Sequence, residues 1–236
     1  MDYNKISKEV REQGVSSVPG FLNTKNFEKV YAALGKNLSP KGGKTSHLPV
    51  SYINYLIKIL KFNFLAIKKS NILKKVAEEL DLNELASNIL GRKTKLLDID
   101  SYLSIKSNKN VLEWHCDKAY SGDLNPTTVI NPNLRSIKFF IYLTDVKYKN
   151  GSLAYIPYSH IVQKAYSNFL YDKKIKYKPF WALKDFRSQI LLEPIKTMLI
   201  NKIGKDMYDR FLSNSSFINS SGDTNAFDKE MKKSGA

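Results

Sequence analysis

Four short runs of β-branched and aromatic residues most constrain the fold of this chain of 236 residues. Between Leu96 and Ser159 the sequence contains LLDIDSYLSIK, VLEWHCD, SIKFFIYLTDV and SLAYIPYS. The segments that separate them, SNKN, SGDLNPTTVINPN and KYKNG, are rich in turn-forming residues. Several short strands with turns between them predict a sheet, a sandwich or a barrel at the centre of the fold.

Helical patterns flank this region on both sides. A helical layer is predicted over about residues 5–90, where Asn23 or Thr24 is placed to cap a helix with apolar residues at helical spacing. Helical character returns over about 173–213 and is broken only at Pro194 and Gly204. We therefore predict a mainly β fold with flanking helices, in a single domain spanning residues 1–236.

Composition narrows the classes of function. The net charge is +16, but the lysines are spread evenly and greatly outnumber the arginines, which does not favour specific nucleic-acid binding. Cys116 is the only cysteine, so no internal disulfide is possible. The first twenty residues contain no apolar run, and no later stretch approaches a membrane span. These features predict a cytoplasmic protein, and they leave its oligomeric state open.

One short motif points to metal chemistry. On a strand, residues two apart face the same side, so His115 and Asp117 would converge while Cys116 points away. An imidazole and a carboxylate are two of the three ligands in the facial triad of non-haem Fe(II) oxygenases. The motif is weak by itself, because a sequence with three histidines also produces it by chance.

The flanking segments make the motif more specific. The chain has EQGVSSVPGFL at 12–22, WHCD at 114–117, YLTDVKYKNGSLAYIPYSH at 142–160 and GDTNAFD at 222–228. In this order they resemble the motifs of the phytanoyl-CoA dioxygenase family of Fe(II)/2-oxoglutarate-dependent oxygenases. Tyr158 stands where the family usually has glycine.

This resemblance implies a double-stranded β-helix of the jelly-roll, cupin-like type. The barrel core would cover about 95–160, a helical insertion about 173–213, and the closing strands would begin at 222–236. It also implies iron ligation by His115 and Asp117, with Fe(II) as cofactor and 2-oxoglutarate as cosubstrate. The reaction would be the hydroxylation of a small organic molecule. Asp117 disfavours halogenation, because related halogenases carry a small residue in place of this carboxylate.

The end of the chain departs from the family pattern. The resemblance places Lys233 where the family has its third ligand, a histidine, and the arginine that binds 2-oxoglutarate does not appear before Ala236. We expect a truncated and incomplete barrel. The alternatives are a non-catalytic barrel that binds a metabolite or partner, or a compensating group such as Lys138.

The remaining candidates each have a structural and a functional interpretation. Lys138 either binds the carboxylate of 2-oxoglutarate or, as its residue type favours, faces solvent. Tyr102 is either a 2-oxoglutarate contact or, preferably, a core aromatic, and Trp114 is expected to pack in the core. His160 is expected to be a hydrogen-bonding structural residue rather than a ligand. His47, in a Gly/Lys loop, is a still weaker candidate.

Overall fold

The computed structural model describes residues 2–34, 45–46, 64–96, 99–101, 114–115, 136–146, 153–176 and 182–217. The chain divides into two compact units, and each is described by itself. The first comprises Met1–Lys8, Ser16–Asn108 and Phe139–Asp145. The second comprises Glu9–Val15, Lys109–Lys138 and Val146–Ala236, so that helix α1 (Tyr3–Gln13) is divided between the units.

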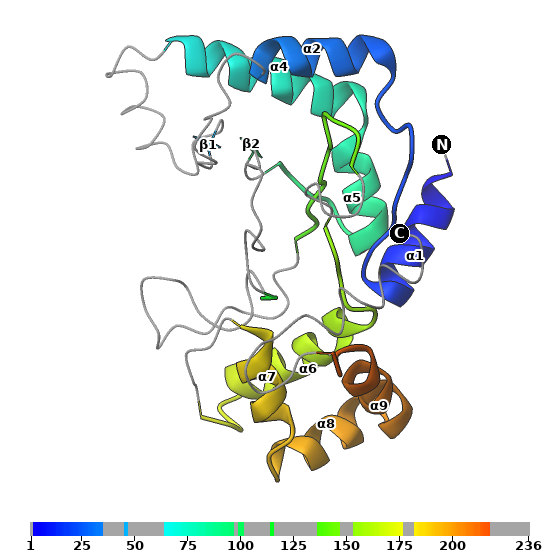
Figure 1. The fold of residues 1–236 in the computed structure, drawn as a ribbon, viewed down its shortest axis with the longest axis vertical. Coiled ribbons are helices and arrows are strands. Elements are labelled where there is room, and N and C mark those ends of the chain that lie inside the picture. Colours follow the sequence, from blue (N-terminus) through cyan, green and yellow to red (C-terminus); the bar gives the residue numbers. More distant parts are fainter. Residues whose placement is uncertain are drawn as a thin grey trace. The chain divides into compact units, whose positions relative to one another are not determined.

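The first unit is built around helices α2 (Thr24–Leu34), α4 (Phe64–Glu79) and α5 (Leu82–Leu90). Asn23 caps α2 as predicted, because its side-chain oxygen accepts a hydrogen bond of 2.8 Å from the Asn26 amide. α2 packs along α4 (Figure 1), and four buried aliphatic side chains form the contact. These are Val30, Leu34, Leu73 and Val76.

The first unit also contains two very short strands. β1 (Thr45–Ser46) pairs antiparallel with β2 (Asp100–Ser101), with Thr45 opposite Ser101 and Ser46 opposite Asp100. An exposed ion pair between Lys29 and Glu79, 2.8 Å apart, links α2 to α4. Such a surface pair contributes little to stability.

The described part of the second unit is mostly helical. α6 (Ser159–Tyr171), α7 (Leu183–Ile190), α8 (Ile195–Ile203) and α9 (Lys205–Asn214) surround one apolar core. The interruptions fall where the sequence predicted them: Pro194 precedes α8, and Gly204 lies between α8 and α9. Gly204 has φ 84° and ψ 150°, a backbone conformation that is open almost only to glycine.

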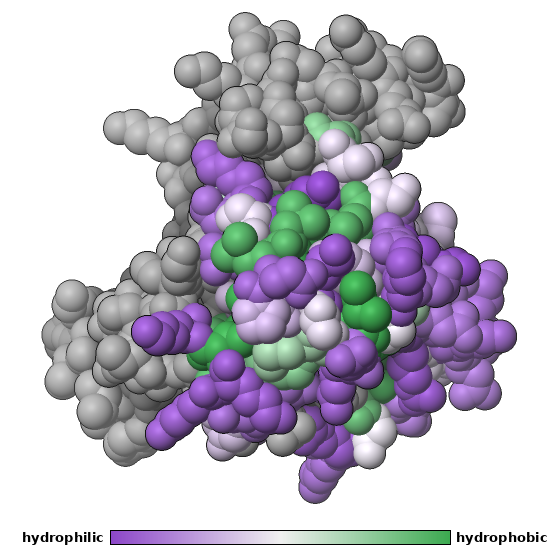
Figure 2. Space-filling model, turned by 90° about the horizontal axis from the view of Figure 1, so that it is seen from below, coloured by the Kyte–Doolittle hydropathy of each residue, from purple (hydrophilic) through white to green (hydrophobic). Residues whose placement is uncertain are grey.

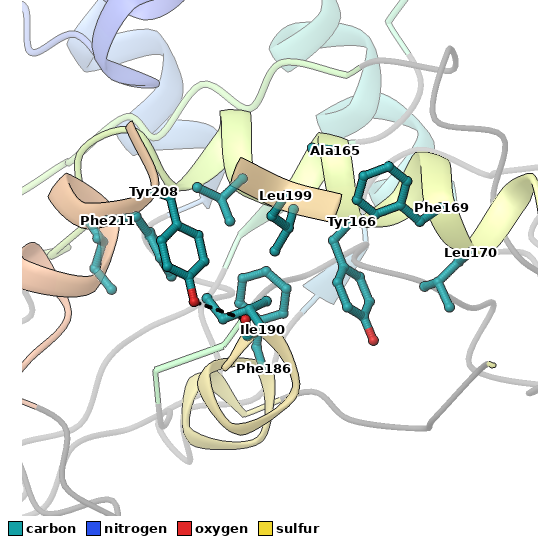
Figure 3. Close-up of a cluster of buried hydrophobic side chains, with 11 residues drawn as sticks. Ala165, Tyr166, Phe169, Leu170, Phe186, Ile190, Leu199, Tyr208 and Phe211 are labelled. Carbon is teal, nitrogen blue, oxygen red and sulfur yellow. Dashed lines mark hydrogen bonds between the residues drawn. The ribbon is translucent and has the colours of Figure 1, made fainter. Parts of the chain in front are cut away.

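The core of this unit is formed by aromatic and aliphatic side chains that point inward from all four helices (Figure 3). Tyr166 on α6 meets the edge of Phe186 on α7, with ring centroids 5.3 Å apart, and Phe186 meets Phe211 on α9 at 5.9 Å. The Tyr208 hydroxyl donates a hydrogen bond of 3.0 Å to the Ile190 carbonyl. Each fully buried side chain of this size contributes about 1.5–3 kcal/mol through burial.

Arg187 joins α7 to the C-terminal end of α9. Its guanidinium donates a hydrogen bond of 3.0 Å to the Leu212 carbonyl and another to the hydroxyl of Ser215, which is fully buried. Burial lowers the pKa of Arg187. A cation at this position also complements the negative end of the α9 dipole.

The predicted mainly β fold is wrong for the part of the chain that the structure describes, which is mostly helical. β1 and β2 are its only strands, and His115 forms a single isolated bridge. The run over 136–146 forms no strand, and Phe140 and Tyr142 within it are 47% and 46% exposed. The run that begins at 152 is described from Leu153, and after Ile156 it enters a turn and then α6.

The physical reason for this error is that β-branched and aromatic residues favour a strand only where a partner strand covers them. No jelly roll is therefore retained as the fold of this chain. Residues 102–113, 116–135 and 222–236, which carry other predicted strands, lie outside the described residues. The predicted single-domain organisation stays a prediction.

On the face shown in Figure 2, hydrophilic residues surround a smaller area of hydrophobic ones. Of the helices that the structure describes, none has both the length and the hydropathy that crossing a membrane requires.

Candidate active site

His115 is held at the start of helix α7. It forms an antiparallel bridge with Ala182, and the Leu183 amide donates a hydrogen bond of 2.8 Å to the Trp114 carbonyl. Ala182 has an extended backbone (φ −72°, ψ 143°) and directly precedes α7, which lets it act as the strand partner of His115. The pairing fixes the backbone of the predicted iron ligand against a packed helix.

Trp114 and His115 line a pocket of about 180 Å³ in the second unit. Leu183 and Phe186 of α7 and Phe211 of α9 form apolar parts of its wall, and Phe186 and Phe211 also belong to the buried core. The walls nearest the core are therefore fixed by the same packing that stabilises the helices.

A second wall comes from the segment 154–156 and from the first turn of α6. Ser159 and Gln163 lie four residues apart on α6, so they share one face of the helix, and both line the pocket. They bring a hydroxyl and an amide to a pocket that is otherwise mainly apolar.

The turn before α6 has a backbone conformation that suits the usual glycine better than Tyr158. Tyr158 has φ 66°, in the left-handed region that glycine enters easily and that costs other residues about 1–2 kcal/mol. A glycine at this position would carry no such cost. The Arg210 guanidinium lies over the Tyr158 ring, 5.9 Å from its centroid, and this cation–π contact favours the observed conformation.

His160 ties this turn to the end of α1. Its Nε2 lies 3.0 Å from the Arg11 carbonyl oxygen, and the Tyr158 amide donates a hydrogen bond of 3.1 Å to the Gln13 carbonyl. Because a carbonyl only accepts, Nε2 carries the proton and Nδ1 does not. Burial lowers the pKa of His160, which outweighs the opposing effect of the hydrogen bond. His160 therefore has the structural role predicted for it.

Gly14 makes this arrangement possible. Its φ of +93° lies in the left-handed range, and a Cβ at this position would lie 2.6 Å from His160 Nδ1. Only a residue without a side chain fits between the end of α1 and the imidazole ring.

The other predicted site residues are placed as follows. Lys138 is exposed, and it is not among the described residues that line the pocket. Trp114 both lines the pocket and packs on Phe217, with ring centroids 4.9 Å apart, so its predicted packing role is only part of what it does. Asp117, Tyr102 and His47 lie outside the described residues.

The described residues provide only some of the donor atoms that an iron site needs. Among the described residues, no three His, Cys, Asp or Glu side chains come together. His115 offers an imidazole nitrogen in a pocket, which fits one position of an iron site. His160 does not fit, because its Nε2 is bound to the Arg11 carbonyl and its Nδ1 is buried against Gly14.

Eight residues of the pocket wall were not predicted from the sequence, among them the segment 154–156. Ser159 and Gln163 had a usable signal, since Ser159 ends the YIPYS run and Gln163 follows one helical turn later. Leu183, Phe186 and Phe211 had none, because they belong to helices whose packing partners the sequence does not specify.

A mainly apolar pocket with a few polar groups, here including His115, has the character of a small-molecule site. The phytanoyl-CoA dioxygenase family model matches residues 10–183, about three quarters of the chain. The chain therefore belongs to the phytanoyl-CoA dioxygenase family, as the motifs predicted. Members of this family generally use Fe(II) and 2-oxoglutarate and act on small molecules. Comparison with curated proteins and with solved structures gave no match.

Proposed function

We propose that this chain is an Fe(II)/2-oxoglutarate-dependent oxygenase that hydroxylates a small organic molecule, with His115 and Asp117 as iron ligands. The observation that carries the proposal is the position of His115 in the pocket, within the segment that matches the family. Asp117 follows two residues later, at the spacing that places both side chains on one face of an extended chain.

In this proposal the protein binds and positions, while Fe(II) and 2-oxoglutarate supply the oxidising chemistry when bound. His115 and Asp117 would hold the metal. The apolar walls formed by Trp114, Phe186 and Phe211 keep water away from the substrate carbon. The pairing of His115 with Ala182 keeps the imidazole on a rigid element, as a site that must orient a C–H bond requires.

Two further contacts are proposed for 2-oxoglutarate. Lys138 would bind one of its carboxylates through an exposed ammonium group, and Tyr102 would donate a hydrogen bond to the cosubstrate. Both are proposals about cosubstrate binding, and neither residue would touch the iron.

The test is an anaerobic titration of the chain with Fe(II) and 2-oxoglutarate, which gives a weak visible charge-transfer band when the chelate forms. We expect His115→Ala and Asp117→Ala each to weaken iron binding by at least about 10–100-fold, since losing even an outer partner of a metal ligand costs that much. His47→Ala is the matched control, because it removes an imidazole that the proposal leaves out of the site. An unchanged band in His115→Ala would overturn the ligand assignment.

A further inference from the structure

The described lining of the pocket lacks any charged side chain of the Lys, Arg, Asp or Glu type. This is unexpected in a chain with a net charge of +16, in which 38 of 236 residues are Lys or Arg. A carboxylate or phosphate inside the pocket would lose part of its hydration without meeting a Lys or Arg side chain from the described walls. An unpaired buried charge is strongly unfavourable, so the lining selects against anionic groups.

Ser159 and Gln163, two uncharged polar residues of the described lining, are one turn apart on α6. His115, the hydroxyl of Tyr155 and the indole N–H of Trp114 are the other polar side-chain groups of this lining. A hydroxyl and a carboxamide both donate and accept hydrogen bonds. They therefore complement a neutral amide or hydroxyl group better than they complement a charge.

The size of the pocket limits what enters it. A dry cavity of about 150 Å³ accommodates benzene, so the 180 Å³ here corresponds to a group of about six to eight non-hydrogen atoms. The apolar surfaces of Trp114, Phe186 and Phe211 suit the carbon skeleton of such a group.

We propose that this pocket binds a small uncharged organic molecule, with its carbon skeleton against Trp114 and Phe186 and its amide or hydroxyl group against Ser159 and Gln163. As an assignment of the substrate class, this inference rests on the proposed function. The binding step itself needs neither iron nor 2-oxoglutarate.

The test compares two molecules of almost identical shape, isovaleramide and isovalerate. Their affinities for the full chain, free of iron and 2-oxoglutarate, are measured by isothermal titration calorimetry. The Trp181→Phe variant leaves Trp114 as the only tryptophan, so a change in its fluorescence locates the ligand in the pocket. We expect isovaleramide to bind at least about ten-fold more tightly than isovalerate, and to change the Trp114 fluorescence.

Gln163→Leu should weaken isovaleramide binding by about ten-fold, because it removes the amide while keeping a good helix former of similar size. Lys164→Leu is the matched control, since it changes the next residue of α6, which is exposed, and should leave the affinity unchanged. Equal affinities for the amide and the carboxylate, or no binding of the amide at its solubility limit, would overturn the proposal.

The outcomes also separate this inference from the proposed function. If isovaleramide binds as expected but the iron chelate band does not form, the pocket assignment stands and the oxygenase proposal fails. If the band forms and depends on His115 but isovalerate binds more tightly, only the substrate class is wrong.

Discussion

Replacing Gly14 by alanine tests the junction between α1 and the turn before α6. The residue has φ +93°, and an alanine methyl group would lie 2.6 Å from His160 Nδ1. The left-handed backbone costs a non-glycine residue about 1–2 kcal/mol. Forcing the extra carbon against a ring that the Arg11 carbonyl holds in place adds about 1–3 kcal/mol. We therefore expect Gly14→Ala to lower the free energy of unfolding by about 2–5 kcal/mol.

The assay is urea denaturation followed by Trp114 fluorescence in the Trp181→Phe background, because Trp114 belongs to the same unit as Gly14. With a denaturant slope of about 1–3 kcal/mol per molar urea, the midpoint should fall by about 1–3 M. The contact with the ring is isolated by repeating the substitution in His160→Ala. In that background only the backbone cost of about 1–2 kcal/mol should remain.

The refuting result is additivity. If the effects of Gly14→Ala and His160→Ala add within about 0.5 kcal/mol, the methyl group does not meet the imidazole, and the proposed fit at this junction is wrong.

Two further predictions concern charged groups in the second unit. Burial lowers the pKa of His160 in the folded chain, so on acidification the unfolded chain takes up the proton first. The contribution of neutral His160 to the free energy of unfolding is complete above the pKa of the unfolded chain, about 6.5. This contribution is lost as the pH falls from there to the pKa of the folded chain. Urea midpoints measured from pH 7.5 to 5.5 should therefore fall less steeply in His160→Gln, and an identical slope would contradict this. Arg187→Ala should lower the free energy of unfolding by about 2–3 kcal/mol, because the Leu212 carbonyl and the buried Ser215 lose a charged donor. Arg187→Lys should recover less than half of this loss in the same urea assay, and a midpoint unchanged in Arg187→Ala would refute the role of the guanidinium.

The features that the sequence predicted correctly are those set by neighbouring residues. Asn23 caps α2 because an asparagine at that position satisfies an amide three residues later. Pro194 and Gly204 separate helices because each restricts or permits its own backbone conformation. The family assignment also followed from the sequence, since its motifs are contiguous.

The predicted strands depended instead on distant partners. The apolar run over 136–146 has the composition of a strand, yet a strand requires a second chain segment in register, which the composition of the run does not provide. The residues of the pocket wall were also predictable only where a local sequence motif identified them. His115 was identified from a local motif, whereas the position of Phe211 in the wall depends on how α9 packs, nearly a hundred residues later.

Helix α6 belongs to both the core and the pocket. Ser159 and Gln163 line the pocket, while Val162 and Tyr166, on the next turns of the same helix, are completely buried. An attempt to change ligand preference by laboratory evolution would therefore act on a helix that also sustains the fold. Variants that enlarge the pocket through α6 will tend to lose thermal tolerance, so selection for a new substrate should begin from a stabilised parent.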